Sequence, residues 1–157
     1  MIFDFISDDA DLNGVLLTPA IYIMPKQGDI MAYILVIDDY EFTRRGMVKL
    51  LQDNGYQVLL AEKQDQIIDT VKKYKPDCIS INLQTPLMNS RNILISLKKQ
   101  GINIPIVALS EDIQDKDKLK YLELGVVDFI NKPPTREVYL QAVNHAITIK
   151  QEIKCPV

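Results

Sequence analysis

Residues 33–39 read Tyr-Ile-Leu-Val-Ile-Asp-Asp, five consecutive apolar residues followed by two adjacent carboxylates. Further short apolar runs follow along the chain at 58–61, 78–83, 104–109 and 126–130. Several of these runs are rich in Ile and Val, and their apolar character is nearly continuous instead of alternating. This pattern is typical of strands that are buried on both faces of a parallel sheet. The chain from residue 33 onward therefore predicts five buried strands.

Segments of helical period lie between and after these runs. Their apolar residues recur at spacings of three and four within 43–54, 64–74, 91–100, 116–124 and 136–150. Gly55, Gly101 and Gly125 follow three of the segments, at positions where helices commonly end on a left-handed residue. Strict alternation with short linkers predicts right-handed crossovers. The expected fold is therefore α/β and flavodoxin-like, a doubly wound (βα)5 domain with a five-stranded parallel sheet in the order 2-1-3-4-5.

The first thirty residues differ from the rest of the chain in charge. They hold five acids and one base, whereas residues 31–157 hold 16 acids and 17 bases. We expect residues 1–30 to be an N-terminal extension, either flexible or upstream of a natural start at Met31. Residues 31–151 are expected to form the domain, and residues 152–157 a tail.

Composition excludes several classes of protein. The chain has 157 residues, 47% of them hydrophobic and 25% charged, with a net charge of −3. These values are typical of one globular domain, and they offer no basic footprint for a nucleic-acid partner. No apolar stretch is long enough to span a membrane. Two cysteines, Cys78 and Cys155, make no disulfide framework and are consistent with the cytoplasm, which is the expected location.

Polar side chains follow the predicted strands where the strands end. Ligands of open parallel sheets bind at this carboxyl edge, and the side chains placed there are Asp38, Asp39, Asn82, Gln84, Ser110 and Lys132. Paired carboxylates beside neutral oxygens suit Mg²⁺, and a hydroxyl with a lysine could hold the oxygens of a phosphoryl group. Taken alone, the aspartate pair also fits a cap for the following helix, Ser110 another cap, and Lys132 a solvated loop residue.

Several motifs together resemble the receiver domain of bacterial two-component response regulators, the fold of the single-domain chemotaxis regulators. They are Ile-Leu-Val-Ile-Asp-Asp at 34–39, Lys-Pro-Asp at 75–77, Pro-Leu-Met at 86–88, Ile-Pro-Ile-Val-Ala-Leu-Ser at 104–110 and Gly-Val-Val-Asp-Phe-Ile-Asn-Lys-Pro at 125–133. The resemblance covers residues 33–151, with the motifs in the family's order and spacing, and does not include residues 1–30.

The resemblance implies a role for each matching position. The implied Mg²⁺ ligands are Asp38, Asp39 and the backbone carbonyl of Gln84. The implied switch residues are Ser110, whose hydroxyl follows the phosphoryl group, and Phe129, an aromatic ring that moves between two positions. Lys132 is the implied ion-pairing lysine, and its bond to Pro133 is expected to be cis. The implied partners are a sensor histidine kinase or another regulator, and the family's usual contact face would comprise residues 116–124, 127–130 and 137–149, which could also form a homodimer.

One departure from the family pattern matters most. The family's phosphoryl acceptor is an aspartate at the end of the third strand, and here Asn82 stands in its place. A carboxamide offers no nucleophilic carboxylate oxygen, and the nearest acid, Asp77, is expected at the opposite end of the strand. Loss of one negative charge also predicts weak Mg²⁺ binding, since a charge pair at ~4 Å is worth about 4 kcal/mol at an effective dielectric near 20.

The sequence therefore favours a stand-alone, non-enzymatic receiver that works by protein–protein contact independently of phosphorylation. Two alternatives stay open at this point. One is a conventional receiver that is phosphorylated on another residue, and the other is a flavodoxin-like binder of a small ligand. The basic residues Arg44, Arg45 and Lys49 are expected on the exposed face of the first helix, and His145 on the face of the last.

Overall fold

The computed structural model describes residues 32–61 and 63–154. The predictions for residues 1–30 and for Cys155 lie outside these ranges. In chain order the elements are β1 (Tyr33–Ile37), α1 (Glu41–Asp53), β2 (Gln57–Leu60), α2 (Gln64–Tyr74), β3 (Cys78–Asn82), α3 (Ser90–Lys99), β4 (Ile106–Ser110), α4 (Asp115–Glu123), β5 (Val126–Asn131) and α5 (Arg136–Lys154). The final helix thus continues past residue 151, where the sequence analysis ended the domain.

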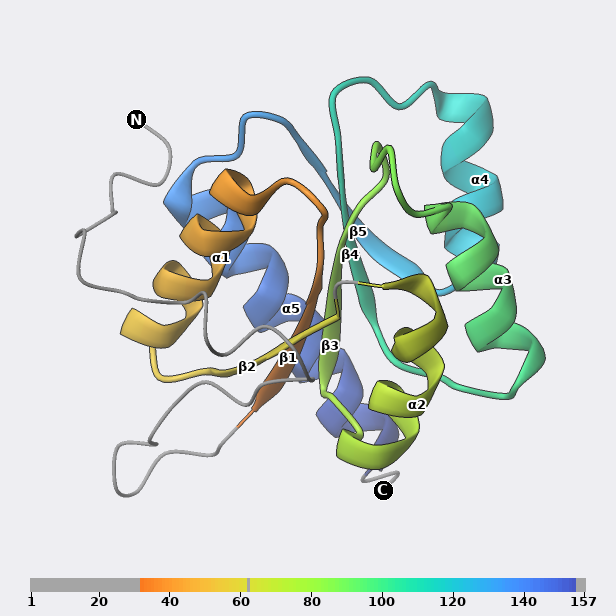
Figure 1. Ribbon diagram of the computed structural model, residues 1–157, viewed down its shortest axis with the longest axis horizontal. Helices are drawn as coiled ribbons and strands as arrows, with labels where there is room; N and C mark the ends of the chain where they lie inside the picture. Colours follow the sequence, from red (N-terminus) through yellow and green to blue (C-terminus); the bar gives the residue numbers. More distant parts are fainter. Residues whose placement is uncertain (1–31, 62, 155–157) are drawn as a thin grey trace.

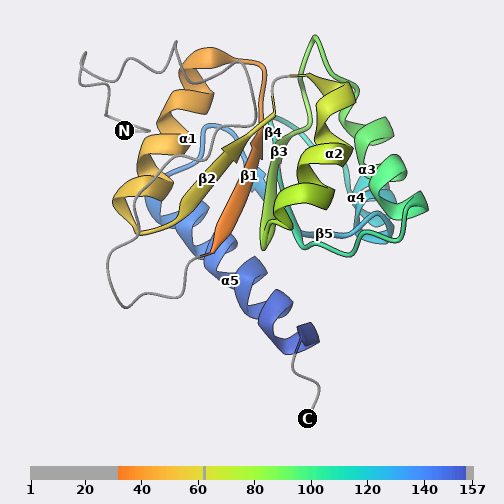
Figure 2. The ribbon, with the colours of Figure 1, turned by 60° about the horizontal axis from the view of Figure 1, so that its bottom comes forward.

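The strands form one parallel sheet in the order β2-β1-β3-β4-β5, which confirms the predicted fold class and topology. Helices α1 and α5 cover one face of the sheet, and α2, α3 and α4 cover the other (Figure 1). In the view of Figure 2 the last turns of α5 extend beyond the sheet. The described residues contain no helix with the length and apolar character needed to cross a bilayer.

Successive residues of a central strand enter opposite cores. Ile34 and Val36 of β1 join the core beneath α1 and α5, whereas Leu35 and Ile37 join the core beneath α2 and α3. All four side chains are fully buried. Because both faces of the sheet are covered, the strands read as nearly continuous apolar runs, and the pattern could locate them in the sequence.

The turns that end the helices fix how the strands enter the sheet. The predicted glycines Gly55, Gly101 and Gly125 have φ values of +86°, +70° and +99°. A left-handed C-cap at Lys75, with φ of +49°, carries no comparable sequence signal. Before α5, the Thr135 hydroxyl accepts a hydrogen bond from the Val138 N–H at 3.2 Å, as expected of a cap.

Candidate functional site

The carboxyl ends of β1, β3 and β4 bring Asp38, Asn82 and Ser110 to one edge of the sheet, and each of the three is at most 2% exposed. Lys132 follows β5 at the same edge, where its backbone N–H donates to the Ser110 carbonyl at 2.8 Å. The peptide bond from Lys132 to Pro133 is cis, as the family resemblance implied. The structure therefore gathers the residues that the sequence analysis placed at strand ends.

Asp38 follows β1, the neighbour of the central strand β3. Its Oδ1 accepts hydrogen bonds from the backbone N–H of Tyr40 at 2.9 Å and from Nδ2 of Asn82 at 3.3 Å. Burial raises the pKa of the Asp38 carboxyl, and Asp39 adds to that effect. The Tyr40 N–H, the Asn82 amide and the positive charge of Lys132 oppose it. The carboxylate is thus held in a site that disfavours its charge.

Arg44 is a member of this site that the sequence analysis misplaced. We expected it on the exposed face of the first helix, but its side chain is buried and its Nη1 donates to the Asp38 carbonyl at 3.0 Å. The guanidinium lies one turn into α1 and reaches back over the β1–α1 turn. Lys49 is partly exposed, as predicted, and pairs with Asp53 in the same helix.

Asp39 joins two loops of the site. Its Oδ2 accepts a hydrogen bond of 2.7 Å from the backbone N–H of Leu87 in the loop between β3 and α3. Among the described residues, Oδ1 of Asp39 and Oδ2 of Asp38 are buried without a hydrogen-bond partner. Two orphaned carboxylate oxygens on adjacent residues are a donor set that suits a hard cation that retains water ligands. The described residues hold no cluster of three or more acidic, histidine or cysteine side chains, so this set is a sparse one.

The amide of Asn82 is oriented by its neighbours. The backbone N–H of Gln84 requires an acceptor, and Oδ1 of Asn82 provides it at 2.9 Å. Nδ2 of Asn82 consequently faces Asp38, because an amide carries its donor and its acceptor on opposite sides. An aspartate at this position would place two carboxylates in contact, whereas the carboxamide donates to the acid. Asn82 therefore links the end of β1 to the β3–α3 loop with no charge of its own.

Side chains of the β3–α3 segment itself also fix the loop between Asn82 and α3. The Ser90 hydroxyl donates to the Asn82 carbonyl at 2.7 Å, and the Thr85 hydroxyl donates to the Met88 carbonyl at 2.7 Å. The Asn89 side chain caps α3 by accepting from the Asn92 N–H at 3.0 Å. The backbone between Asn82 and α3 is thus held by several side chains of its own segment.

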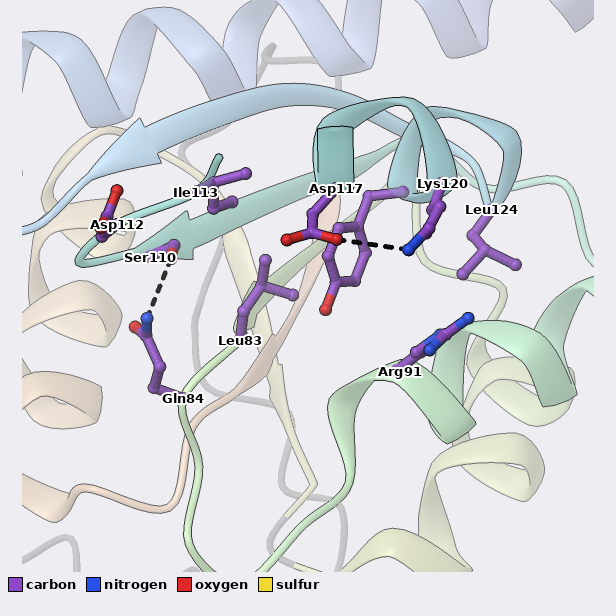
Figure 3. Close-up of a pocket in the computed structure, with 10 residues that line it drawn as sticks. Leu83, Gln84, Arg91, Ser110, Asp112, Ile113, Asp117, Lys120 and Leu124 are labelled. Atoms are coloured by element: carbon purple, nitrogen blue, oxygen red, sulfur yellow. Dashed lines mark hydrogen bonds and ion pairs between the residues drawn. The ribbon is translucent and has the colours of Figure 1, made fainter. Parts of the chain in front are cut away.

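Gln84 uses its side chain in a way that the sequence did not indicate. The family resemblance implied a metal-binding role for its backbone carbonyl only, whereas its side-chain amide donates from Nε2 to Oγ of Ser110 at 3.0 Å (Figure 3). Its Oε1 accepts from the backbone N–H of Glu111 at 2.9 Å. The two bonds connect the β3–α3 loop to the β4–α4 loop, and a cavity of about 340 Å³ lined by Arg91, Tyr121 and other residues adjoins them.

Phe129, the predicted aromatic switch, lies half-buried against the core beneath α2 and α3. Its ring meets that of Tyr121 from α4 edge to face, with 6.4 Å between the ring centres and 72° between the planes. Lys132 is half-buried, and its Nζ lies 6.0 Å from the centre of the Tyr40 ring. Asp77 lies at the opposite end of the sheet, as predicted, and accepts a hydrogen bond from the Tyr33 N–H.

Comparison with known proteins decides the family. The sequence model of the response regulator receiver domain matches residues 34–144, which is most of the chain. The chain belongs to the response regulator receiver family. Its sheet order and its paired acids at the end of β1 fit this assignment.

Individual receiver proteins show how far the likeness extends. The alkaline phosphatase synthesis transcriptional regulatory protein PhoP of Bacillus subtilis is 33% identical over 128 residues, which are 78% of this chain and 51% of PhoP. The chemotaxis protein CheY of Bacillus subtilis is 28% identical over 115 residues, 73% of this chain and 96% of CheY. The structure of CheY4 from Vibrio cholerae aligns with a TM-score of 0.69 at 24% identity, covering 74% of this chain and 99% of that one.

The receiver domain spans about half or less of the length of the first curated relatives that it matches, such as PhoP and the response regulator MprA of Mycobacterium species. It spans nearly all of CheY and of the protein PilH of Pseudomonas aeruginosa. The family thus contains both the domain by itself and the domain within longer regulators.

Proposed function

We propose that this receiver domain takes part in two-component signalling as a module that is not switched by phosphorylation and that acts through contacts with other proteins in the cytoplasm. The observation that carries the proposal is the carboxamide of Asn82, buried beside Asp38 where the family places its acceptor aspartate. Acceptance of a phosphoryl group needs an ionised carboxylate oxygen that attacks phosphorus. The Asn82 amide is neutral, and both of its polar atoms are already used in hydrogen bonds.

In this proposal no other carboxylate of the site accepts a phosphoryl group in place of Asn82. Asp38 is buried, and its Oδ1 already accepts two hydrogen bonds. Asp39 has one oxygen bonded to the Leu87 N–H and lies beside the acid that would share a cation with it. The free oxygens of these two residues instead suit Mg²⁺ held with several waters, together with the backbone carbonyl of Gln84. We propose that Mg²⁺ binds here weakly, because one carboxylate fewer faces it than in the family pattern.

The proposed partners are a sensor histidine kinase or a second regulator. Because the site lacks a nucleophile paired with a base, we propose no enzymatic activity. Two leucines on the outer side of α4, Leu119 and Leu122, are 66% and 48% exposed, and they belong to the face that the family resemblance implied for partner contact and for a homodimer. Exposed apolar side chains of this size support a protein-binding role for that face.

The test is a phosphorylation assay that uses acetyl phosphate with Mg²⁺ and reads the intact mass. We expect the native protein to gain no phosphoryl group, and Asn82→Asp to gain one that is stable in acid and labile in base, as an acyl phosphate is. The matched control is Asn103→Asp, which adds the same charge on an exposed loop at the far end of the sheet.

An adduct on the native protein that is stable in acid and labile in base would identify a conventional receiver with another acceptor and overturn the proposal. Failure of Asn82→Asp to react would show that Asp38, Asp39, Ser110 and Lys132 no longer form a phosphoryl pocket. A small molecule that purifies with the native protein would instead favour the ligand-binding alternative.

A further inference from the structure

The loop between β4 and α4 has little packing of its own. Its residues Glu111, Asp112 and Gln114 are exposed, and Ile113 is half-buried. The cavity of about 340 Å³ beside it is lined by Ser110, Asp112 and Ile113 from this segment. A loop that borders open space instead of a packed core depends on hydrogen bonds to stay in one conformation.

Gln84 supplies two of those hydrogen bonds from across the site. Figure 3 shows its side chain reaching from the end of β3 towards Ser110 at the end of β4. The Glu111 N–H donates to Oε1 at 2.9 Å, so Nε2 is the atom that faces the Ser110 hydroxyl at 3.0 Å. One amide therefore holds both the last residue of β4 and the first residue of the loop.

The side-chain amide of Gln84 is part of a chain of hydrogen bonds that joins the ends of three strands. Asp38 is bonded to Asn82, whose Oδ1 accepts from the Gln84 backbone, and the Gln84 side chain continues to Ser110 and Glu111. Every link consists of groups that this chain carries itself. The β1, β3 and β4 ends are thus connected without a cation and without a phosphoryl group.

We infer that Gln84 is a positioning residue that holds the Ser110 hydroxyl and the β4–α4 loop in one arrangement. In that arrangement the Ser110 oxygen accepts a hydrogen bond from the neutral Gln84 amide, which holds the hydroxyl beside the β3–α3 loop while its own O–H stays free to donate. The inference deepens the proposed function, since it names the side chain that keeps the loop fixed where the acceptor is absent. It also stands on geometry that does not involve the reactivity of Asn82.

The test measures hydrogen exchange at the Glu111 amide in Gln84→Met, which keeps the length of the side chain and removes its hydrogen bonds. We expect exchange at Glu111 to become about fivefold faster, the effect of losing one ordinary hydrogen bond. Gln84→Glu retains the acceptor for the Glu111 N–H, and its second carboxylate oxygen can accept from the Ser110 hydroxyl in place of the lost Nε2 donor, so this variant is expected to keep the native protection. The matched control, Gln141→Met, alters an exposed glutamine of α5 and is expected to leave Glu111 unchanged.

A second readout follows Ser110 itself. In the Asn82→Asp background, adding Gln84→Met is expected to accelerate phosphorylation by acetyl phosphate several-fold, because the amide no longer holds the Ser110 hydroxyl in one position. In that reaction a carboxylate oxygen forms a bond to phosphorus while the bond from phosphorus to acetate breaks and acetate leaves.

Unchanged exchange at Glu111 in Gln84→Met, or equal loss of protection in Gln84→Glu, would overturn the inference. An unaltered rate of phosphorylation in the double variant would do the same. If Asn82→Asp takes up no phosphoryl group at all, the exchange measurement alone decides the role of Gln84. A phosphoryl adduct on the native protein overturns the proposed function and leaves the exchange measurement unaffected.

Discussion

Replacement of Asn82 by aspartate is expected to lower the free energy of unfolding of the domain. The Asn82 amide donates to Asp38 at 3.3 Å and both side chains are buried, so Asn82→Asp exchanges an attractive contact for two carboxylates at nearly the same separation. Two unit charges ~4 Å apart repel by about 4 kcal/mol at an effective dielectric near 20. Lys132 compensates for part of this repulsion, and we expect a net loss of about 2–4 kcal/mol at neutral pH without divalent cations.

Urea unfolding followed by circular dichroism measures this loss. A domain of this size has a free energy of unfolding of roughly 5–15 kcal/mol, so Asn82→Asp is expected to fold but to unfold at a clearly lower urea concentration. Added Mg²⁺ is expected to restore about 2–3 kcal/mol to Asn82→Asp at a concentration near 100 times its dissociation constant, and much less to the native protein.

The control for this experiment is Asn103→Asp, which carries the same added charge on a loop at the opposite end of the sheet. It is expected to stay within about 0.5 kcal/mol of the native protein. The reasoning fails if Asn82→Asp is as stable as the native protein in the presence of a chelator. It also fails if Mg²⁺ stabilises both proteins equally, since the amide would then not take the place of a cation.

Three further perturbations test other parts of the structure. Tyr139→Phe removes the buried 2.8 Å hydrogen bond from the Tyr139 hydroxyl to Oγ of Ser80, and urea unfolding is expected to show a loss of about 1–2 kcal/mol that is smaller in a Ser80→Ala background. Burial raises the pKa of the Asp38 carboxyl above its ordinary value of 3.8. The contribution of this group to the free energy of unfolding is therefore fully present below pH 3.8 and is lost as the pH rises through the higher folded pKa. The free energy of unfolding of Asp38→Asn, measured against pH, is expected to lack this decline. Gly125→Ala meets no close atom, with Ile106 Cδ1 at 3.6 Å from the added carbon, yet a φ of +99° is strained for alanine, and thermal unfolding is expected to show a loss of about 1–2 kcal/mol, whereas no loss would show that the turn relaxes.

The strands could be located from sequence because β1 to β4 are almost entirely buried and β5, at the edge of the sheet, is partly buried. Their ends were harder to place, and β4 begins at Ile106 although apolar character starts at Ile104. Pro105 has no N–H to donate, so it stands before the strand and contributes only its carbonyl, which accepts from Ile79 at 3.0 Å. The pattern of apolar residues reports burial, and burial continues past the point where strand pairing stops.

The candidate site could be predicted in part. Asp38, Asn82 and Ser110 follow directly from the rule that polar residues at strand ends meet at one edge. The roles of Gln84 and Arg44 could not be predicted, because each depends on the path of a loop or turn that brings its side chain back over the sheet. A long polar side chain reads in the sequence as a solvated surface group whether or not a backbone partner lies within its reach.

The use of Asn82 as a bridge to Asp38 has a consequence for how the surface would behave in a living cell. A surface that required a bound cation or a phosphoryl group would vary with the supply of each. A bridge that consists of a neutral side chain draws on neither supply. The contacts that join Asp38, Asn82 and Gln84 would therefore keep their geometry whatever the supply of either.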